Sequence, residues 1–217
     1  MQRIINVLLL LVIVVGVVQL VRKQRNLTIV QAEHSRLAQP YGLLEVKDKS
    51  KFLIKRVKTD DPKHFLWHCY CPTNVELEER SGFGRPKKCG SSTFVNDDTY
   101  LIRCRFDVRD GVLRAHIIER MGYGRRDFDR KPVLEFVNQH WNELELDVLA
   151  TAADLTLDTT QVLNFLTIRI PESLRVDFTQ QVGETLAKQY TEEPFFQMLY
   201  GTPEAFVSYD QEHTQSE

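Results

Sequence analysis

The chain has few cysteines, and they do not form the framework of a small disulfide-rich protein. Four cysteines are spread over 217 residues, whereas a disulfide scaffold concentrates its cysteines in a much shorter chain. A chain of this length has room for one membrane segment and one globular domain that buries its own core. The cysteine count therefore excludes a disulfide scaffold and leaves the redox compartment open.

The common catalytic signatures are also missing. The sequence contains no G-x-S-x-G nucleophile elbow, no H-E-x-x-H zinc motif, no calcium-binding loop and no dinucleotide fingerprint. The glycines around Cys89 do not match the phosphate-binding pattern G-x-x-x-x-G-K-[ST] either. The sequence thus assigns no catalytic, cofactor-binding or metal-binding residue, indicates no cofactor, and does not predict an enzyme.

Basic residues are scarce in the C-terminal part of the chain, although the net charge of -2 hides this. Residues 1–131 contain 25 Lys and Arg against 15 Asp and Glu, while residues 132–217 contain 3 against 15. Oppositely charged parts of one chain favour packing on each other, and such an asymmetry also steers anionic partners towards one face. Because the chain as a whole is slightly acidic, we do not expect a nucleic acid partner.

One long apolar run lies near the N-terminus. Residues 4–21 carry no charge, and a helix of that length spans about 27 Å, close to the hydrocarbon thickness of a bilayer. A cleaved signal peptide is the main alternative, but its apolar region is usually about 7 to 15 residues long. No A-x-A-like cleavage site precedes Arg22. The run predicts a transmembrane helix at 4–21 after a short tail at 1–3.

The charges that flank this run predict its orientation. Arg3 and the amino terminus precede it, whereas Arg22, Lys23 and Arg25 follow it. The cytoplasmic flanks of membrane helices carry an excess of Lys and Arg. We therefore expect a single-pass protein of the inner membrane, with the lipid bilayer as the partner of residues 4–21 and the main domain in the cytoplasm.

Residues 22–40 continue a helical pattern beyond the membrane and form an expected stalk. The side chains at 3-4-3 spacing are Leu27, Val30, His34 and Leu37. This seam covers less than two heptads, so it does not support a coiled coil by itself. The alternatives are a solvated helix and a weak homodimer that the membrane helix supports.

Residues 41–205 form the expected soluble domain, and residues 206–217 form a polar tail. The pattern changes after Pro40 from helical to period two, which indicates strands at 51–58 and 63–71 joined as a hairpin. Helices are expected at 131–144 and 178–190, and further strands at 144–150 and 161–171. Strands followed by interspersed helices predict an α+β domain around a mostly antiparallel sheet.

The clearest element is a second hairpin at 99–121. Its Asp110-Gly111 pair supplies the two positive-φ residues of a type I′ turn, and the turn fixes the register of the strands. One face is apolar and pairs Cys104 with Ile117. The arginine face opposite it contains Arg103, Arg105, Arg109, Arg114 and Arg120. This face binds anionic lipid or phosphate in one interpretation, and in the other it is solvated or covered by the acidic C-terminal part.

The stretch 64–72 concentrates aromatic, histidine and cysteine side chains. Strand alternation places Cys69 and Cys71 on the same face as Trp67. Because core-facing positions accept small apolar side chains, we interpret both cysteines as core thiols.

Two alternatives for this stretch are a metal site and a disulfide. His64 and His68 are four strand residues apart, about 13 Å, which is too far for both to bind one metal ion. Cys69 and Cys71 remain candidates for metal ligands, or for disulfide partners of Cys104 if the strands adjoin.

Cys89 lies in a different setting, the stretch SGFGRPKKCGSS, whose glycines predict a loop. The neighbouring Lys87 and Lys88 favour a thiolate, which makes Cys89 the best nucleophile candidate in the chain. No histidine lies in this loop, and no signature of a cysteine hydrolase is present. A thiol-based or metal-dependent enzyme that uses Cys89, or Cys69 and Cys71, is thus the alternative to a non-catalytic module.

The first third of the chain resembles a known group of proteins. The apolar run followed by RKQR, and the stretches AEHSRL, LLEVKDKSKF and DPKHFLWHCYCP, resemble small single-pass membrane proteins of planctomycete bacteria. In that family the strand is similar to W-R-V-Y-L-P, so Cys69 and Cys71 occupy aliphatic positions. The resemblance covers roughly residues 1–75 and carries no functional residue across. The sequence as a whole predicts a non-catalytic interaction or structural module at the inner membrane, with an unidentified protein partner.

The apolar run generates the first testable prediction. If residues 4–21 span the bilayer, washing membranes with alkaline carbonate leaves the full-length, unprocessed polypeptide in the pellet. A variant that begins at Arg22 is released to the supernatant, and immunoblotting of both fractions measures the difference. Recovery of the unprocessed full-length chain in the supernatant contradicts the anchor.

Overall fold

The computed structural model describes a compact unit that begins at Leu44. The described residues are 44–94, 99–120, 122–150 and 154–214, together with Gln19. The expected N-terminal tail, and all of the expected transmembrane helix and stalk except Gln19, lie outside these residues. Among the helices that the structure describes, none has the length and apolar character needed to cross a membrane.

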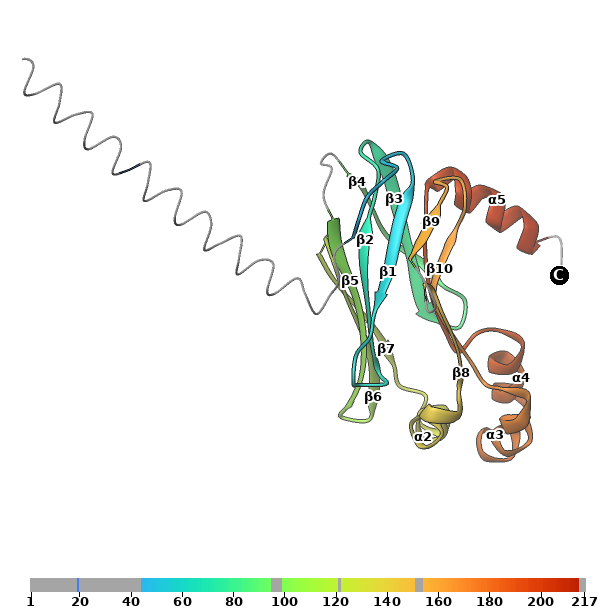
Figure 1. The fold of residues 1–217 in the computed structure, drawn as a ribbon. Helices are drawn as coiled ribbons and strands as arrows, with labels where there is room; N and C mark the ends of the chain where they lie inside the picture. The colour runs from blue at the N-terminus through green and yellow to red at the C-terminus, as the bar shows by residue number, and fades with distance from the viewer. Residues whose placement is uncertain (1–18, 20–43, 95–98, 121, 151–153, 215–217) are drawn as a thin grey trace, which may run out of the picture. The chain divides into compact units, whose positions relative to one another are not determined.

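The described residues form two antiparallel sheets that pack face to face (Figure 1). One sheet contains β1 (Phe52–Val57), β2 (His64–Tyr70), β5 (Thr99–Arg109), β6 (Val112–Glu119), β7 (Gly122–Phe128) and β9 (Leu155–Leu157), in the spatial order β7-β6-β5-β2-β1-β9. The other contains β3 (Val75–Phe83), β4 (Lys87–Phe94), β8 (Glu145–Val148), β10 (Leu163–Arg169) and β11 (Phe196–Gly201), in the order β4-β3-β11-β10-β8.

Helices cover one end and one outer face of this sandwich (Figure 1). They are α2 (Lys131–Gln139), α3 (Arg175–Val182), α4 (Glu184–Glu192) and α5 (Pro203–Thr214). The first three lie together at one end, whereas α5 packs on the outer side of β3 and β11. The prediction of an α+β fold with antiparallel strands is confirmed, but the strands form two sheets instead of one.

The core between the sheets is rich in aromatic rings. Phe106 on β5 is 2% exposed and lies near its centre. Its ring centroid is 4.9 Å from that of Phe196 on β11 and 5.2 Å from that of Trp141, which follows α2. Phe65 and Phe83 extend this cluster along both sheets. Such rings bury large apolar areas, so they supply much of the force that holds the sheets together.

The β5–β6 hairpin has the predicted turn and register. Asp110 and Gly111 adopt φ values of 55° and 72°, as a type I′ turn requires. Cys104 pairs with Ile117, and both side chains are buried. The β1–β2 hairpin is confirmed as well, with Arg56 paired to Trp67.

The helices differ from the prediction in their boundaries. The single helix expected at 178–190 is divided into α3 and α4 by Gly183, whose φ of 86° interrupts the helical backbone. The helix expected at 131–144 ends at Gln139, and a short 3-10 turn follows it. Residues 206–214 of the expected polar tail belong to α5, and their first side chain, Phe206, is fully buried.

The prediction of a loop around Cys89 was wrong. Most of SGFGRPKKCGSS belongs to β3 and β4, and the connection between these strands is Gly84–Pro86. Gly84 adopts a φ of 74°, which explains the glycine at the turn. Gly82 and Gly90 lie inside strands. The high glycine content of this stretch therefore does not indicate a loop. The strand β7, which contains two glycines, was missed for the same reason.

The aromatic core generates a stability prediction. Replacing Phe106 by Ala leaves a cavity between the sheets, and we expect a loss of about 3 to 5 kcal/mol in the free energy of unfolding. Urea unfolding of a fragment of residues 44–217 measures it. Val108→Ala on the same strand is the control, because Val108 is 42% exposed and its loss changes stability by only about 0.5 kcal/mol. Equal effects at both positions contradict this description of the core.

Candidate functional site

Three of the four cysteines lie in the core. Cys69, Cys71 and Cys104 are at most 1% exposed, and their thiols are free, so the core interpretation is confirmed. Burial raises the pKa of each thiol, that of Cys71 to about 12. These thiols stay protonated at neutral pH and are poor nucleophiles. Within the ranges given above, no group of three or more His, Cys, Asp or Glu side chains is arranged to hold a metal ion.

The arginine face lies on the outer side of the six-stranded sheet, where carboxylates alternate with its cations. Arg105 lies 3.8 Å from Asp61, and Arg114 lies 3.9 Å from Asp110. The carboxylate of each pair is exposed, so each pair is weak, but the carboxylates still offset the positive potential of the surface. The face therefore offers an anionic ligand less unbalanced charge than its five arginines suggest.

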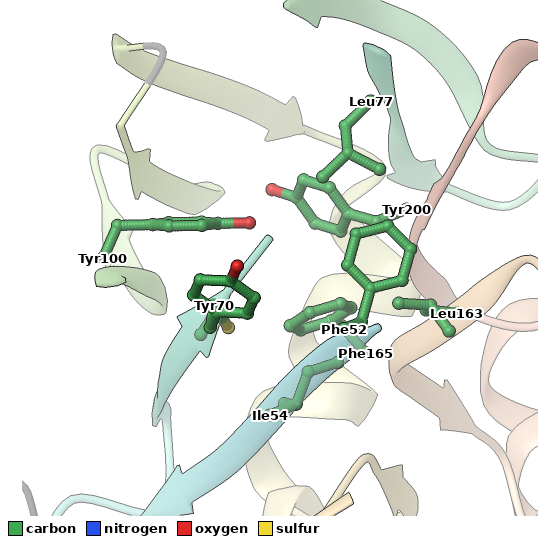
Figure 2. Close-up of a pocket in the computed structure, with 9 residues that line it drawn as sticks. Phe52, Ile54, Tyr70, Leu77, Tyr100, Leu163, Phe165 and Tyr200 are labelled. Carbon is green, nitrogen blue, oxygen red and sulfur yellow. The ribbon is translucent and has the colours of Figure 1, made fainter. Parts of the chain in front are cut away.

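A small cavity lies between the sheets and is shown in Figure 2. Its volume is about 10 Å³, which is room for at most one water molecule. The hydroxyl groups of Tyr70, Tyr100 and Tyr200 point toward the space between the three rings, while apolar side chains such as Phe52 and Phe165 line the rest (Figure 2). The cavity is too small to bind a substrate or cofactor.

The candidate site is a groove at the edge of the sandwich, where β4 ends one sheet and β7 ends the other. Two hollows of about 370 and 590 Å³ adjoin there and share Cys89, Arg125 and Arg126 in their walls. Strands β3 and β4 form one wall, and β7 with the end of β6 forms the other. We call this feature the β4–β7 groove.

Arg126 links the two sheets on the floor of the groove. Its Nε donates a hydrogen bond to Ser81 Oγ at 2.9 Å, and its Nη2 donates to Glu79 Oε1 at 3.3 Å. Ser81 Oγ also donates to Glu79 Oε1, at 2.6 Å. Glu79 is only 4% exposed, and a buried carboxylate requires such partners. These contacts show that β7, the edge strand of its sheet, lies opposite β3. Strand β4, the edge strand of the other sheet, lies beyond it.

Glu119, the last residue of β6, brings a second carboxyl group to the same place. Tyr200 on β11 donates its hydroxyl proton to Glu119 Oε2 at 2.8 Å. Burial raises the pKa of Glu119 to about 8, and the charge of Glu79 and a hydrogen bond between the two carboxyl groups act in the same direction. Tyr200 and Arg126 oppose the increase. The raised pKa therefore favours the protonated form of Glu119 at neutral pH.

Cys89 faces the groove because of a β-bulge. The register between β3 and β4 shifts after Glu79, and Cys89 is the extra residue in β4. Its Sγ lies 3.5 Å from Ser81 Oγ and donates to the carbonyl oxygen of Lys87 at 2.9 Å. The thiol is exposed, but no histidine lines either hollow in the described part of the chain. Cys89 thus lies in the site without a neighbouring general base of that type.

Cationic side chains dominate the walls of the groove. They are Arg85, Lys87, Lys88, Arg125, Arg126 and Arg130. Three of them have carboxylate partners, since Arg125 lies 3.0 Å from Asp127, Lys88 contacts Glu78, and Arg126 lies 3.3 Å from Glu79. Arg130 donates to the neutral amide of Gln189 at 2.8 Å and so keeps its full charge for a ligand. The groove carries a clear excess of positive charge.

The carboxyl cluster was missed at the level of sequence, although a signal was present. Leu77, Glu79, Ser81 and Phe83 alternate along VELEERSGF, as the inward side of a strand does. Polar residues at two inward positions indicate a buried polar cluster. No protein-family model, curated protein or solved structure matches the chain. The function is therefore argued from the geometry and charge of the groove.

The carboxyl pair generates a prediction about pH. Glu119 binds its proton more tightly in the folded chain than in the unfolded chain, where the ordinary value near 4.5 applies. The folded state therefore loses stability as the pH rises from about 4.5 to about 8, by at most ~1.4 kcal/mol per pH unit for one proton. We expect Glu119→Gln to remove this slope in urea unfolding of residues 44–217.

The control for this experiment is Glu76→Gln. Glu76 is exposed on the same strand as Glu79 and lies outside the cluster. We expect this variant to retain the full dependence of the unfolding free energy on pH. Identical pH profiles for the two variants contradict the role assigned to Glu119.

Proposed function

We propose that the chain is a membrane-anchored, non-catalytic binding module that takes an anionic partner in the β4–β7 groove. One observation carries the proposal: six cationic residues line a single groove at an open edge of the sandwich. Clefts lined by charge of one sign concentrate ligands of the opposite sign and speed their association. The groove is also the one described hollow that joins both sheet edges, β4 and β7.

The anchor and the location are part of the same proposal. The uncharged run at 4–21 and the resemblance to single-pass planctomycete proteins support an inner-membrane protein. The positive residues after the run support a cytoplasmic domain. In this arrangement the module holds its anionic partner close to the cytoplasmic surface of the membrane.

A non-catalytic role agrees with the way the polar groups of the groove are used. Glu119 has the raised pKa of a general acid, which favours acid–base catalysis as a second candidate function. Its carboxyl group is held by Tyr200, however, and Glu79 is held by Arg126 and Ser81. These hydrogen bonds join the two sheets, so we assign the pair a structural role. Cys89 is the one thiol that reaches the groove, and Cys89→Ser leaves anion binding intact in this proposal.

Retention on immobilised heparin, a polyanion, tests the proposal. We expect the fragment 44–217 to bind at low salt and elute as the salt concentration rises. Lys87→Glu combined with Arg130→Glu reverses two charges of the groove and weakens binding by about tenfold or more. Isothermal titration with soluble heparin provides the affinities.

The matched control reverses two charges on the other basic surface. Arg103→Glu with Arg105→Glu changes the net charge of the fragment by the same amount but alters the arginine face. We expect this variant to keep most of its heparin affinity. A larger loss in the arginine-face variant, or no retention of the unaltered fragment, contradicts the groove as the anion site.

A further inference from the structure

We propose that the partner in the β4–β7 groove is an extended, acidic polypeptide segment that pairs its backbone with the free edge of β7. This inference rests on the proposed function and adds the chemical class of the ligand. Three features of the groove lead to it: a free strand edge, space beside that edge, and the arrangement of charge.

The free edge belongs to β7. No described strand pairs with its outer side, and its seven residues extend about 24 Å. An edge strand presents backbone N–H and C=O groups that are matched to another extended chain. The other edges are less suitable, since β9 has three residues, β8 has four, and a bulge at Cys89 interrupts β4.

The space for a paired strand lies beside β7 and beneath β4. Because Arg126 connects β7 to β3, the inner face of β4 extends beyond the edge of the six-stranded sheet. A Cβ atom placed on Gly90 of β4 has no neighbour within 4 Å, and the same holds for Gly122 at the start of β7. Glycines that leave such open space permit close approach of another backbone. A strand added to β7 occupies the position that faces β4 across the sandwich.

The charges beside this position favour carboxylate side chains. Lys87 on β4 and Arg130, two residues after the end of β7, line the same hollow, and Arg125 lies on β7 itself. Strand pairing brings every second side chain of the ligand to the same face, so acidic residues in alternation reach these cations. A polyphosphate chain carries charge on every unit and also meets Asp127, Asp129 and Glu79. The mixed charge of the groove therefore suits an acidic peptide better.

Fluorescence anisotropy with the full-length chain in detergent micelles tests the inference. The probe is a labelled heptapeptide of alternating valine and glutamate. Its control has the same side chains but carries N-methyl groups on alternate backbone nitrogens, which removes the donors needed for strand pairing while preserving charge. We expect the affinity of the control to be lower by a factor of about ten or more, because several ladder hydrogen bonds are lost.

A variant of the protein tests the position of the peptide. Gly90→Val adds a side chain to open space beneath β4, and we expect at least about tenfold weaker peptide binding without loss of folding. Thr93→Val is the matched control, because Thr93 is exposed and pairs with Glu76 on the outward side of the hairpin. Retained peptide affinity in Gly90→Val contradicts the assigned position.

The outcomes distinguish this inference from the proposed function. If the heptapeptide and its N-methylated form bind alike, or neither binds while heparin retention still depends on Lys87 and Arg130, strand pairing is wrong and the anion site remains. If the unaltered protein binds neither the heptapeptide nor heparin, both the strand-pairing inference and the proposed anion site are wrong. Concentration-dependent dimers that disappear in Gly90→Val identify a second copy of the chain as the occupant and overturn the peptide.

Discussion

Burial of aromatic rings between the two sheets is the interaction on which the rest of the structure depends. Phe106 on β5 contacts Phe196 on β11, and this packing fixes how far apart the sheets lie and which strands face each other. At β3 and β7 the ring contact between Phe83 and Phe128 continues the core, and Glu79 and Arg126 join the same two strands by a hydrogen bond. The groove exists because the two sheets end at different strands, and its polar floor marks the edge of the core.

The sequence predicted those parts of the fold that local rules determine. The Asp110-Gly111 turn fixed a hairpin register that the structure reproduces, and strand alternation placed Cys69 and Cys71 in the core. Local rules failed for β3 and β4, because glycines at strand positions resemble the composition of a loop. They also failed to divide the strands between two sheets, since that division depends on pairings between segments far apart in the chain.

The candidate site was less predictable than the fold for a related reason. The sequence indicated Cys89 as a candidate nucleophile because Lys87 and Lys88 are its neighbours in the chain. Glu79 and Glu119 come from strands in different sheets, and no spacing along the chain indicates that they meet. The raised pKa of Glu119 comes from burial and from this neighbour, so it follows from the tertiary structure. The neutral form of Glu119 that this pKa favours reduces the repulsion between two carboxyl groups that lie close together.

The pairing of β3 with β11 has a consequence for the order of synthesis and folding. β3 lies early in the domain, whereas β11 is the last strand that the structure describes. The β5–β6 and β3–β4 hairpins close short loops and form fast, but the pairing of β3 with β11 must wait for a strand far along the chain. During translation the five-stranded sheet therefore stays incomplete until β11 has been synthesised. Nascent chains that have not reached β11 therefore expose the edge of β3 that β11 covers in the folded domain.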